Sequence, residues 1–230
     1  MEKLKSQPGI VRVNKETYQI AKFKNEMLYY DFAEIVYFLI AKGKSLFGEH
    51  FKIYKIDLPL LHKLICYRIA DPNYCKKYNI DTKKGLLLTG PIGCGKTSII
   101  TLLKHITPHL PSYQVIPARN VTFSFNFLGY KVIQNYGDSS HYCFDDIGVE
   151  PTGKHFGKEC NVIGEILLSR YEMYLKANKL KSRGLQLKTH ATTNLNADEL
   201  EEKYGNRVRS RMREMFNLIS FDPNSDDKRS

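Results

Sequence analysis

The stretch LLLTGPIGCGKTSII, residues 86–100, decides the fold of this chain. An apolar run without polar alternation leads into a glycine-rich loop, and a segment of helical character follows the loop. The loop matches the pattern G-x-x-x-x-G-K-[ST], and the order strand, loop, helix makes this pattern specific for bound phosphate. We therefore expect a run of residues to hold a nucleoside triphosphate: Gly90, Pro91, Ile92, Gly93, Cys94, Gly95, Lys96, Thr97 and Ser98.

The residue types in this loop follow from the chemistry of phosphate. Glycines let the backbone N–H groups approach the phosphates closely, and the next helix adds the partial positive charge of its N-terminus. Lys96 is expected to reach the β and γ phosphates, and the Thr97 hydroxyl to coordinate Mg²⁺. Cys94 is interpreted as a spacer. The loop alone leaves nucleotide kinases, GTPases, transporter subunits and motor ATPases open.

Two acids narrow this choice. The segment HYCFDDIGVE, residues 141–150, is an apolar run that delivers two carboxylates where a strand is expected to end. Asp145 takes the position of a Walker B acid that holds Mg²⁺, usually through water, and Asp146 is placed to orient and deprotonate an attacking water. The alternative is an Asp pair that caps a loop. Paired acids favour water as the acceptor of the phosphoryl group.

A further strand, expected within LQLKTHATTN (residues 185–194), also ends in polar residues. The carboxyl ends of parallel strands meet at one crevice, so Asn194 is expected to lie between the phosphate loop and the acids. There it would hold the lytic water, and Thr192 or Thr193 could serve instead.

Arginines alternate with other residues in YGNRVRSRMREMF, residues 204–216. Arg207 and Arg211 are four residues apart and would share one face of a helix. One interpretation is a solvated basic face. The other is an arginine finger that reaches the γ-phosphate bound to an adjacent subunit.

From Gly85 onward the pattern strand, loop, helix repeats, which predicts an α/β fold of the P-loop NTPase class. We expect a five-stranded parallel sheet between helices over residues 81–222, with strands in GLLLTG, SYQVIPA, HYCFDD, LQLKTHATTN and NLISF. The intervening segments 120–137 and 161–178 are expected to be helical. Residues 223–230 are expected to form a flexible tail.

Residues 1–80 carry no catalytic signature and are expected to form a small, mainly helical region. A first helix is predicted over residues 25–43, ending near Gly43, and a second over residues 57–71. Asp57 is its expected N-cap, Pro59 lies in its first turn, and Asp71 with Pro72 closes it. The first helix is so apolar that it must pack on the core or dock on a partner protein.

The composition favours a polyanionic partner. The chain has 230 residues, of which 42% are hydrophobic, and a formal net charge of +11. Such an excess suits nucleic acid or a membrane surface, although a basic protein with scattered surface charge is the alternative. No apolar run is long enough to span a membrane and no signal peptide is recognisable, so we expect a cytoplasmic protein. The five cysteines are expected to be reduced thiols.

The motifs GPIGCGKT, DDIGVE, TTN and YGNRVRSRM occur in the order seen in AAA+ ATPases. The set resembles the DnaC/DnaI helicase loaders and the IstB transposition ATPases over residues 85–221. The resemblance implies that Lys96 and Thr97 bind ATP and Mg²⁺ and that Asp145 and Asp146 form the Walker B pair. It further implies that Asn194 is sensor 1 and that Arg207 or Arg211 is the finger.

The same resemblance implies a homo-oligomer with ATP between subunits, acting on DNA with a replicative helicase or transposase that docks on residues 1–80. No C-terminal lid domain is expected, a feature that the short-lidded loaders share. The alternatives are a P-loop small-molecule kinase and a nucleotide-gated adaptor that hardly hydrolyses ATP. Basic residues in two loops are candidates for contact with DNA phosphates: Lys154, His155, Lys158, Lys179, Lys181 and Arg183.

Overall fold

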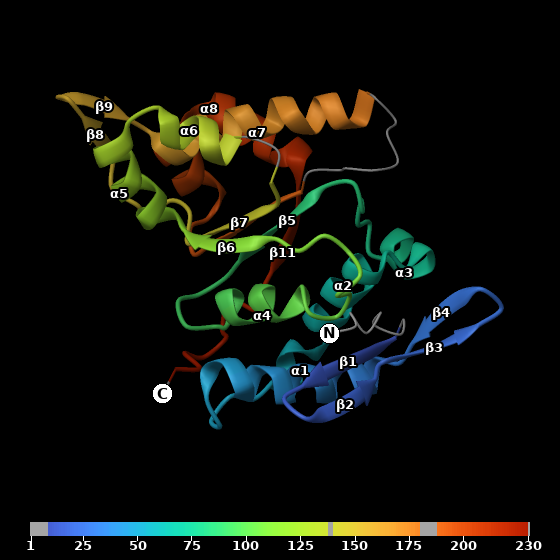
Figure 1. The fold of residues 1–230 in the computed structure, drawn as a ribbon. Coiled ribbons are helices and arrows are strands. Elements are labelled where there is room, and N and C mark those ends of the chain that lie inside the picture. The colour runs from blue at the N-terminus through green and yellow to red at the C-terminus, as the bar shows by residue number, and fades with distance from the viewer. Residues whose placement is uncertain (1–8, 138–139, 180–187, 230) are drawn as a thin grey trace, which may run out of the picture. The chain divides into compact units, whose positions relative to one another are not determined.

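The computed structural model describes residues 9–137, 140–179 and 188–229 (Figure 1). The chain divides into two compact units. The N-terminal unit contains residues 1–80 and 98–112, and the sheet unit contains residues 81–97 and 113–230. The first unit is thus made of two separate stretches of the chain, because residues 98–112 return to it after the phosphate loop. Two of the candidate DNA contacts, Lys181 and Arg183, lie outside the described residues.

The sheet unit is built on five parallel strands: β5 (Gly85–Thr89), β6 (Gln114–Pro117), β7 (Tyr142–Asp145), β10 (Thr189–Thr193) and β11 (Phe216–Ser220). Their order across the sheet is β11-β5-β10-β7-β6. The parallel five-stranded sheet predicted from the sequence is thus confirmed. The phosphate-loop strand β5 and the acid strand β7 both pair with β10, so their carboxyl ends lie at the same edge.

Close packing explains why the first sheet strand has its sequence. Leu86 and Leu88 are 0% exposed, as expected for a strand covered on both faces. Gly85 begins the strand because a Cβ there would collide with the carbonyl oxygen of Thr189 on the neighbouring strand. The strand therefore delivers its last residue, Thr89, directly into the phosphate loop.

Four helices of the sheet unit pack together on one face of the sheet (Figure 1): α5 (Ala118–Leu128), α6 (Lys131–Gly137), α7 (Val162–Lys179) and α8 (Ala197–Met215). Helix α7 buries one face through Ile163, Ile166 and Leu167. The predicted helical segment 120–137 is interrupted at Gly129, where the left-handed backbone (φ 59°) ends α5.

The segment after the acids forms a β-hairpin, β8 (Gly153–His155) and β9 (Lys158–Cys160), although the sequence suggested a plain loop. Its turn residues Phe156 and Gly157 have φ values of 46° and 79°. Two successive left-handed residues give the turn that suits the twist of a two-residue hairpin. The sequence did not predict this turn, because a phenylalanine rarely adopts the left-handed conformation.

The N-terminal unit contains two hairpins, β1 (Ile10–Val13) with β2 (Glu16–Gln19) and β3 (Ala21–Lys24) with β4 (Met27–Tyr30). Its helical part consists of α1 (Phe32–Phe47), the short helix η1 (Lys55–Asp57), α2 (Leu58–Ile69) and α3 (Pro72–Lys77). Helix α4 (Lys96–Leu103) starts at the phosphate loop, and its residues from Ser98 onward belong to this unit.

The predicted bounds of the first helix were wrong at both ends. Residues 27–30 form strand β4 because Asn25 and Glu26 adopt left-handed backbones that turn the chain back on itself. Helix α1 begins at Phe32, after Asp31 caps it by accepting hydrogen bonds from two backbone N–H groups. It continues past Gly43, where the ring of Phe51 packs in the space that a Cβ would take.

The second helix begins and ends close to the predicted bounds. Pro59 lies in its first turn, but the Asp57 side chain makes no capping hydrogen bond. Ala70 ends the helix in the left-handed conformation, and Asp71 then caps α3 through the N–H groups of Asn73 and Tyr74. Within the described parts of the chain, no helix is both long and apolar enough to cross a bilayer.

Candidate active site

The phosphate loop, residues 90–97, has the backbone that its glycines predict. Gly93 and Gly95 have φ values of 77° and 100°, in the left-handed region that residues with a Cβ rarely adopt. The side chain of Cys94 between them is buried beneath the loop, and Ile92 at the tip is 64% exposed. Pro91 is half-buried, and Ser98 follows as the third residue of α4.

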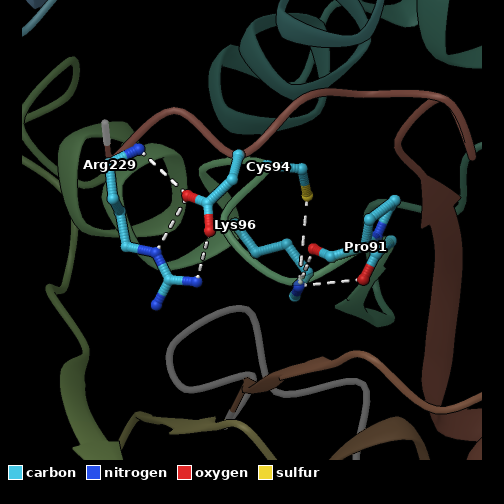
Figure 2. Close-up of polar contacts among 6 residues, drawn as sticks. Pro91, Cys94, Lys96 and Arg229 are labelled. Carbon is cyan, nitrogen blue, oxygen red and sulfur yellow. Dashed lines mark hydrogen bonds and ion pairs between the residues drawn. The ribbon is translucent and has the colours of Figure 1, made fainter.

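Lys96 is folded back onto its own loop (Figure 2). Its Nζ donates to the carbonyl oxygens of Gly90 at 2.9 Å and Pro91 at 2.8 Å, and lies 3.9 Å from the Cys94 sulfur. The side chain is only 5% exposed. A lysine held in this way is prepared to exchange carbonyl partners for phosphate oxygens, which carry more negative charge. The sulfur of Cys94, which was interpreted as a spacer, thus lies beside the ammonium group.

Thr97 and Asp145 meet at the start of α4. The Thr97 hydroxyl donates to the two carboxylate oxygens of Asp145 at 2.9 and 3.1 Å. Burial raises the pKa of Asp145 above its ordinary value, and the nearby Asp146 raises it further, whereas hydrogen bonds from Thr192 and Thr97 oppose the shift. This carboxyl group is therefore desolvated and lies beside a hydroxyl.

Those two side chains fit the site expected for Mg²⁺. The ion prefers hard oxygen ligands in octahedral geometry and usually keeps several waters. Among the described residues no cluster of three or more His, Cys, Asp and Glu side chains could hold a metal on its own. An ion here would therefore take its other ligands from phosphate and water. When bound, it would offset the charge on the phosphate oxygens.

Thr192 joins the two acids. Its hydroxyl donates to Oδ1 of Asp145 at 2.7 Å and accepts from the backbone N–H of Asp146 at 2.8 Å. Asp146 has a left-handed backbone (φ 54°) and an exposed side chain, whereas Asp145 is 8% exposed. Strained backbone of this kind gathers at functional sites. The pair is thus divided into one buried carboxylate and one that water can reach.

The polar end of β10 lies at the acids, as expected, but the residue in contact with Asp145 is Thr192. Thr193 donates to the carbonyl of Ile147 at 2.8 Å, and Asn194 lies half-buried just after the strand. The sequence named Thr192 as a substitute for Asn194 without a reason to prefer it. Strand alternation relative to Asp145 could have supplied that reason.

Helix α8 breaks at Gly205, where φ is 79° and ψ is 158°. The first half is capped by Asn196 and Glu199, and the second half carries the arginines. Arg207 is exposed, whereas Arg211 donates to the carbonyl of Arg207 at 2.9 Å and lies 5.4 Å from the ring centroid of Tyr171.

The arginines in the second half of α8 differ in their surroundings. Across residues 9–137, 140–179 and 188–229, none of Arg207, Arg209, Arg211 and Arg213 forms an ion pair. The two arginines proposed as a finger are therefore unequal. Arg207 is available to an external anion, and Arg211 is engaged with Tyr171 of its own chain.

The C-terminal segment lies on the phosphate loop. The backbone N–H of Lys228 donates to the carbonyl of Gly93 at 3.0 Å, and its Nζ donates to the carbonyl of Cys94 at 2.8 Å. The Asp227 carboxylate contacts Gly93 so closely that a Cβ there would collide with it. Arg229 donates to this carboxylate from its backbone and its guanidinium (Figure 2). Nothing in the sequence pattern signalled this contact.

Many solved structures resemble this chain, and two of them have TM-scores of 0.50 or more. A protein described as a primosome component from Streptococcus pyogenes serotype M3 has a TM-score of 0.51 and 19% sequence identity, and the match covers 74% of this chain and 81% of that one. The DnaC helicase loader has a TM-score of 0.50 and 16% identity, with 76% of this chain and 95% of that one covered. No protein-family model and no curated protein matches the sequence.

These likenesses show the fold: the chain has the α/β fold of AAA+ P-loop proteins, and the structural resemblance to helicase loaders that its motifs predicted is confirmed.

Proposed function

We propose that this protein hydrolyses ATP at a seam between copies of itself. In one copy Lys96 and the loop amides hold the phosphates, Thr97 and Asp145 hold Mg²⁺, and Asp146 orients and deprotonates the attacking water. Arg207 of the adjacent copy reaches the γ-phosphate. Asn194 remains the proposed sensor, with Thr192 holding the acids in place.

The observation that carries the proposal is the hydrogen bonding of Thr192. A single hydroxyl bonds to the buried metal-binding acid and to the backbone of the exposed acid at 2.7 and 2.8 Å. This arrangement gives two adjacent carboxylates different surroundings, and so different tasks. A loop-capping pair would need no such division.

The test is the specific ATPase activity across a dilution series. If Arg207 acts across a seam, activity per subunit rises with protein concentration and saturates when assembly is complete. A flat profile with intact Arg207 would contradict the seam. Analysis of the products separates the alternatives: a kinase forms a phosphorylated acceptor, and a nucleotide-gated adaptor releases no phosphate in a single turnover.

We also propose that the protein acts on DNA through one surface of the sheet unit. The aromatic surface consists of exposed side chains on α5, on the following turn and at the tip of the β8–β9 hairpin: Phe123, Phe127, Leu128, Tyr130 and Phe156. The hairpin is held to α5 by a 2.7 Å hydrogen bond from the backbone of Lys154 to the side chain of Asn126.

The chemistry of this surface suits a single strand. Phe127 is 83% exposed and Phe156 is 94% exposed, so bases could stack on both rings. Lys154 and Lys158 on the same hairpin are exposed and could contact phosphates, within a chain whose net charge is +11. Lys179, at the end of α7, remains a separate candidate for DNA contact.

Binding of fluorescent single-stranded oligonucleotides tests this assignment. Phe156→Ala should weaken binding about 5- to 100-fold, because base stacking contributes about 1–3 kcal/mol per ring. Phe23→Ala, which removes a ring that is 65% exposed in the N-terminal unit, is the matched control and should leave binding unchanged. Equal losses for both variants would remove the aromatic surface from the proposal.

The protein partner is proposed to be a replicative helicase or transposase that docks on the N-terminal unit. Its β3–β4 hairpin exposes three large side chains, since Phe23, Met27 and Tyr29 are 65%, 57% and 51% exposed. Met27→Lys in the full chain should abolish co-elution with a replicative helicase that the wild type binds and leave ATPase activity intact. Retained co-elution would direct attention to another surface of this unit.

A further inference from the structure

A buried contact joins the turn after the acids to the arginine helix. Glu150 is 3% exposed, and its Oε1 accepts a hydrogen bond from the Tyr204 hydroxyl at 2.8 Å. Its Oε2 accepts from the backbone N–H of Gly148 at 2.7 Å. Lys203 adds a bond from its Nζ to the Glu150 carbonyl at 2.7 Å. Consecutive residues of α8 are therefore fixed to one residue of the turn.

The contact falls at the break in α8. Tyr204, 7% exposed, is the last residue before Gly205, and Arg207 follows two residues after the break. A Cβ on Gly205 would meet nothing within 4 Å, so the break is not imposed by local crowding. The bond to Glu150 therefore anchors α8 immediately before the break.

The other end of the contact reaches the acids. The turn from Asp145 to Glu150 is tied to β10 at two points, because Asp146 N–H donates to the Thr192 hydroxyl and Ile147 N–H donates to the Thr192 carbonyl, both at 2.8 Å. Two sets of hydrogen bonds, one at Asp146 and Ile147 and one at Gly148, Glu150 and Tyr204, are thus joined by the covalent chain of the turn. Each bond lies within the sheet unit.

We propose that Glu150 and Tyr204 are positioning residues that set the place of Arg207 relative to the acids of their own chain. This inference rests on the proposed seam, at which Arg207 serves the neighbouring copy. A shift of the turn when Asp145 and Asp146 engage nucleotide would be passed to Tyr204 and so to the arginine. Each subunit would then present its finger according to the state of its own site.

The chemistry at the contact points the same way. Burial and the adjacent Glu150 carboxylate raise the pKa of Tyr204 well above its ordinary value, so the hydroxyl remains protonated and donates. Tyr204→Phe removes this donor and leaves the ring in the core. The substitution therefore loosens the anchor without changing the phosphate loop, either acid or Arg207.

The test uses mixtures of two variants. Tyr204→Phe alone should bind ATP as the wild type does and lose about 10- to 100-fold in kcat, since small misplacements of reacting groups cost this much. Asp146→Asn alone should lose about 10²-fold or more in kcat but should retain its arginine. In a 1:1 mixture the Asp146→Asn copies supply fingers to the Tyr204→Phe copies, so kcat per Tyr204→Phe subunit should recover most of the way to the wild-type value at the mixed seams.

Two further variants distinguish failure of the seam from failure of the positioning role. Arg207→Ala mixed with Asp146→Asn should recover in the same way; if it does not, the seam itself is wrong and the inference falls with it. If that pair recovers and the Tyr204→Phe pair does not, the seam stands and the positioning role is refuted. Unchanged kcat for Tyr204→Phe alone would also refute it. Tyr171→Phe is the matched control, because it removes another tyrosine–glutamate bond to α8, at an exposed site and 2.7 Å in length, and should leave kcat unchanged.

Discussion

The acids and the arginine helix are built in opposite ways within one unit. Asp145 is 8% exposed and accepts hydrogen bonds from two hydroxyls of its own chain. Arg207 is exposed and, in the part of the chain that the structure describes, forms no ion pair. One charged group is fixed and desolvated, and the other is left in water.

The difference indicates which half of the site is complete. Desolvating a carboxylate costs free energy that only fixed hydrogen bonds or a metal can offset, so Asp145 is prepared in advance for a ligand. An exposed guanidinium carries no such cost and retains its full capacity for a phosphate. The chain therefore contains a buried carboxylate that is already held by hydrogen bonds and an exposed guanidinium that can still bind a phosphate. This is expected if the two halves of the site meet across a seam.

Removing the exposed guanidinium of Arg207 should have the largest effect on kcat. Arg207→Ala is expected to lower kcat by about 10³-fold, because arginine fingers contribute about 10³–10⁵ to the rate of phosphoryl transfer. Arg211→Ala should cost less than about tenfold, because Arg211 already contacts Tyr171 and the Arg207 carbonyl. Steady-state ATPase assays at saturating protein concentration measure both.

Binding of a fluorescent ATP analogue provides the control for this pair of variants. Neither substitution touches the phosphate loop, so the dissociation constants should equal that of the wild type. If Arg211→Ala proved the more damaging variant, the contrast between the exposed and the engaged arginine would be reversed, and Arg211 would be the finger.

The exposed acid should rank second. Asp146→Asn is expected to lower kcat by about 10²-fold or more, since a positioned base contributes about 10²–10⁴ to the rate. ATP binding should persist, because Asp146 is tied to Thr192 through its backbone N–H, which the substitution keeps. A lowered kcat with unchanged ATP affinity supports the assignment; loss of binding would transfer the metal-binding role to Asp146.

Much of this contrast could be predicted from local sequence. Gly93, Gly95, Lys96 and Thr97 stand at fixed spacing because a backbone loop must wrap a phosphate, and no distant residue is needed to recognise it. The acids could be predicted in the same way, because an apolar run that ends at Asp145 indicates where a strand ends in the sheet. These features depend on neighbours in sequence.

Features that depend on distant contacts could not be predicted in this way. Thr192 rather than Asn194 reaches Asp145 because of the register between β10 and β7, which pairs Ala191 with Phe144. The anchoring of Tyr204 by Glu150 joins residues 54 positions apart. The aromatic residue Phe156 at a left-handed turn position opposes ordinary preference, and tertiary contacts of the hairpin with α5 hold it there.

The buried acid should show a smaller effect, on stability. Its pKa is raised by burial, so folding favours the protonated form and the charged form destabilises the native state as pH rises above the ordinary value of 3.8. In Asp145→Asn the uncharged amide oxygen can still accept the two hydroxyl hydrogen bonds that Oδ1 accepts, from Thr97 and Thr192, whereas the amide nitrogen cannot accept the second Thr97 contact. We expect a gain of about 0.5–2 kcal/mol at pH 7, or a few degrees in melting temperature, as for other strained active sites.

Thermal unfolding without nucleotide or magnesium measures this gain. The difference between variant and wild type should shrink as the pH falls towards 4, because the wild-type carboxyl then becomes neutral too. A variant less stable than the wild type at pH 7 would mean that the hydrogen bonds to Thr97 and Thr192 more than offset the cost of burying the charge.

The smallest effect is expected at the C-terminal segment, where a carboxylate of the same chain lies against the phosphate loop. Hydrogen bonds from Arg229 lower the pKa of Asp227 to about 2, so the carboxylate against Gly93 is charged at neutral pH. A bound triphosphate would be repelled by it. Asp227→Asn should therefore tighten ATP binding about two- to fivefold at low salt, the size typical of exposed charge interactions, and the gain should fade at high salt.

Asp226→Asn is the matched control, because it removes the same charge from the adjacent position, and its effect should be smaller. Isothermal titration at two salt concentrations measures both. Weaker ATP binding by Asp227→Asn would reverse the interpretation. The carboxylate would then hold Arg229 beside the loop as a further cation for the phosphates. The phosphate site would in that case depend on the C-terminal segment as well as on the buried residues of the loop.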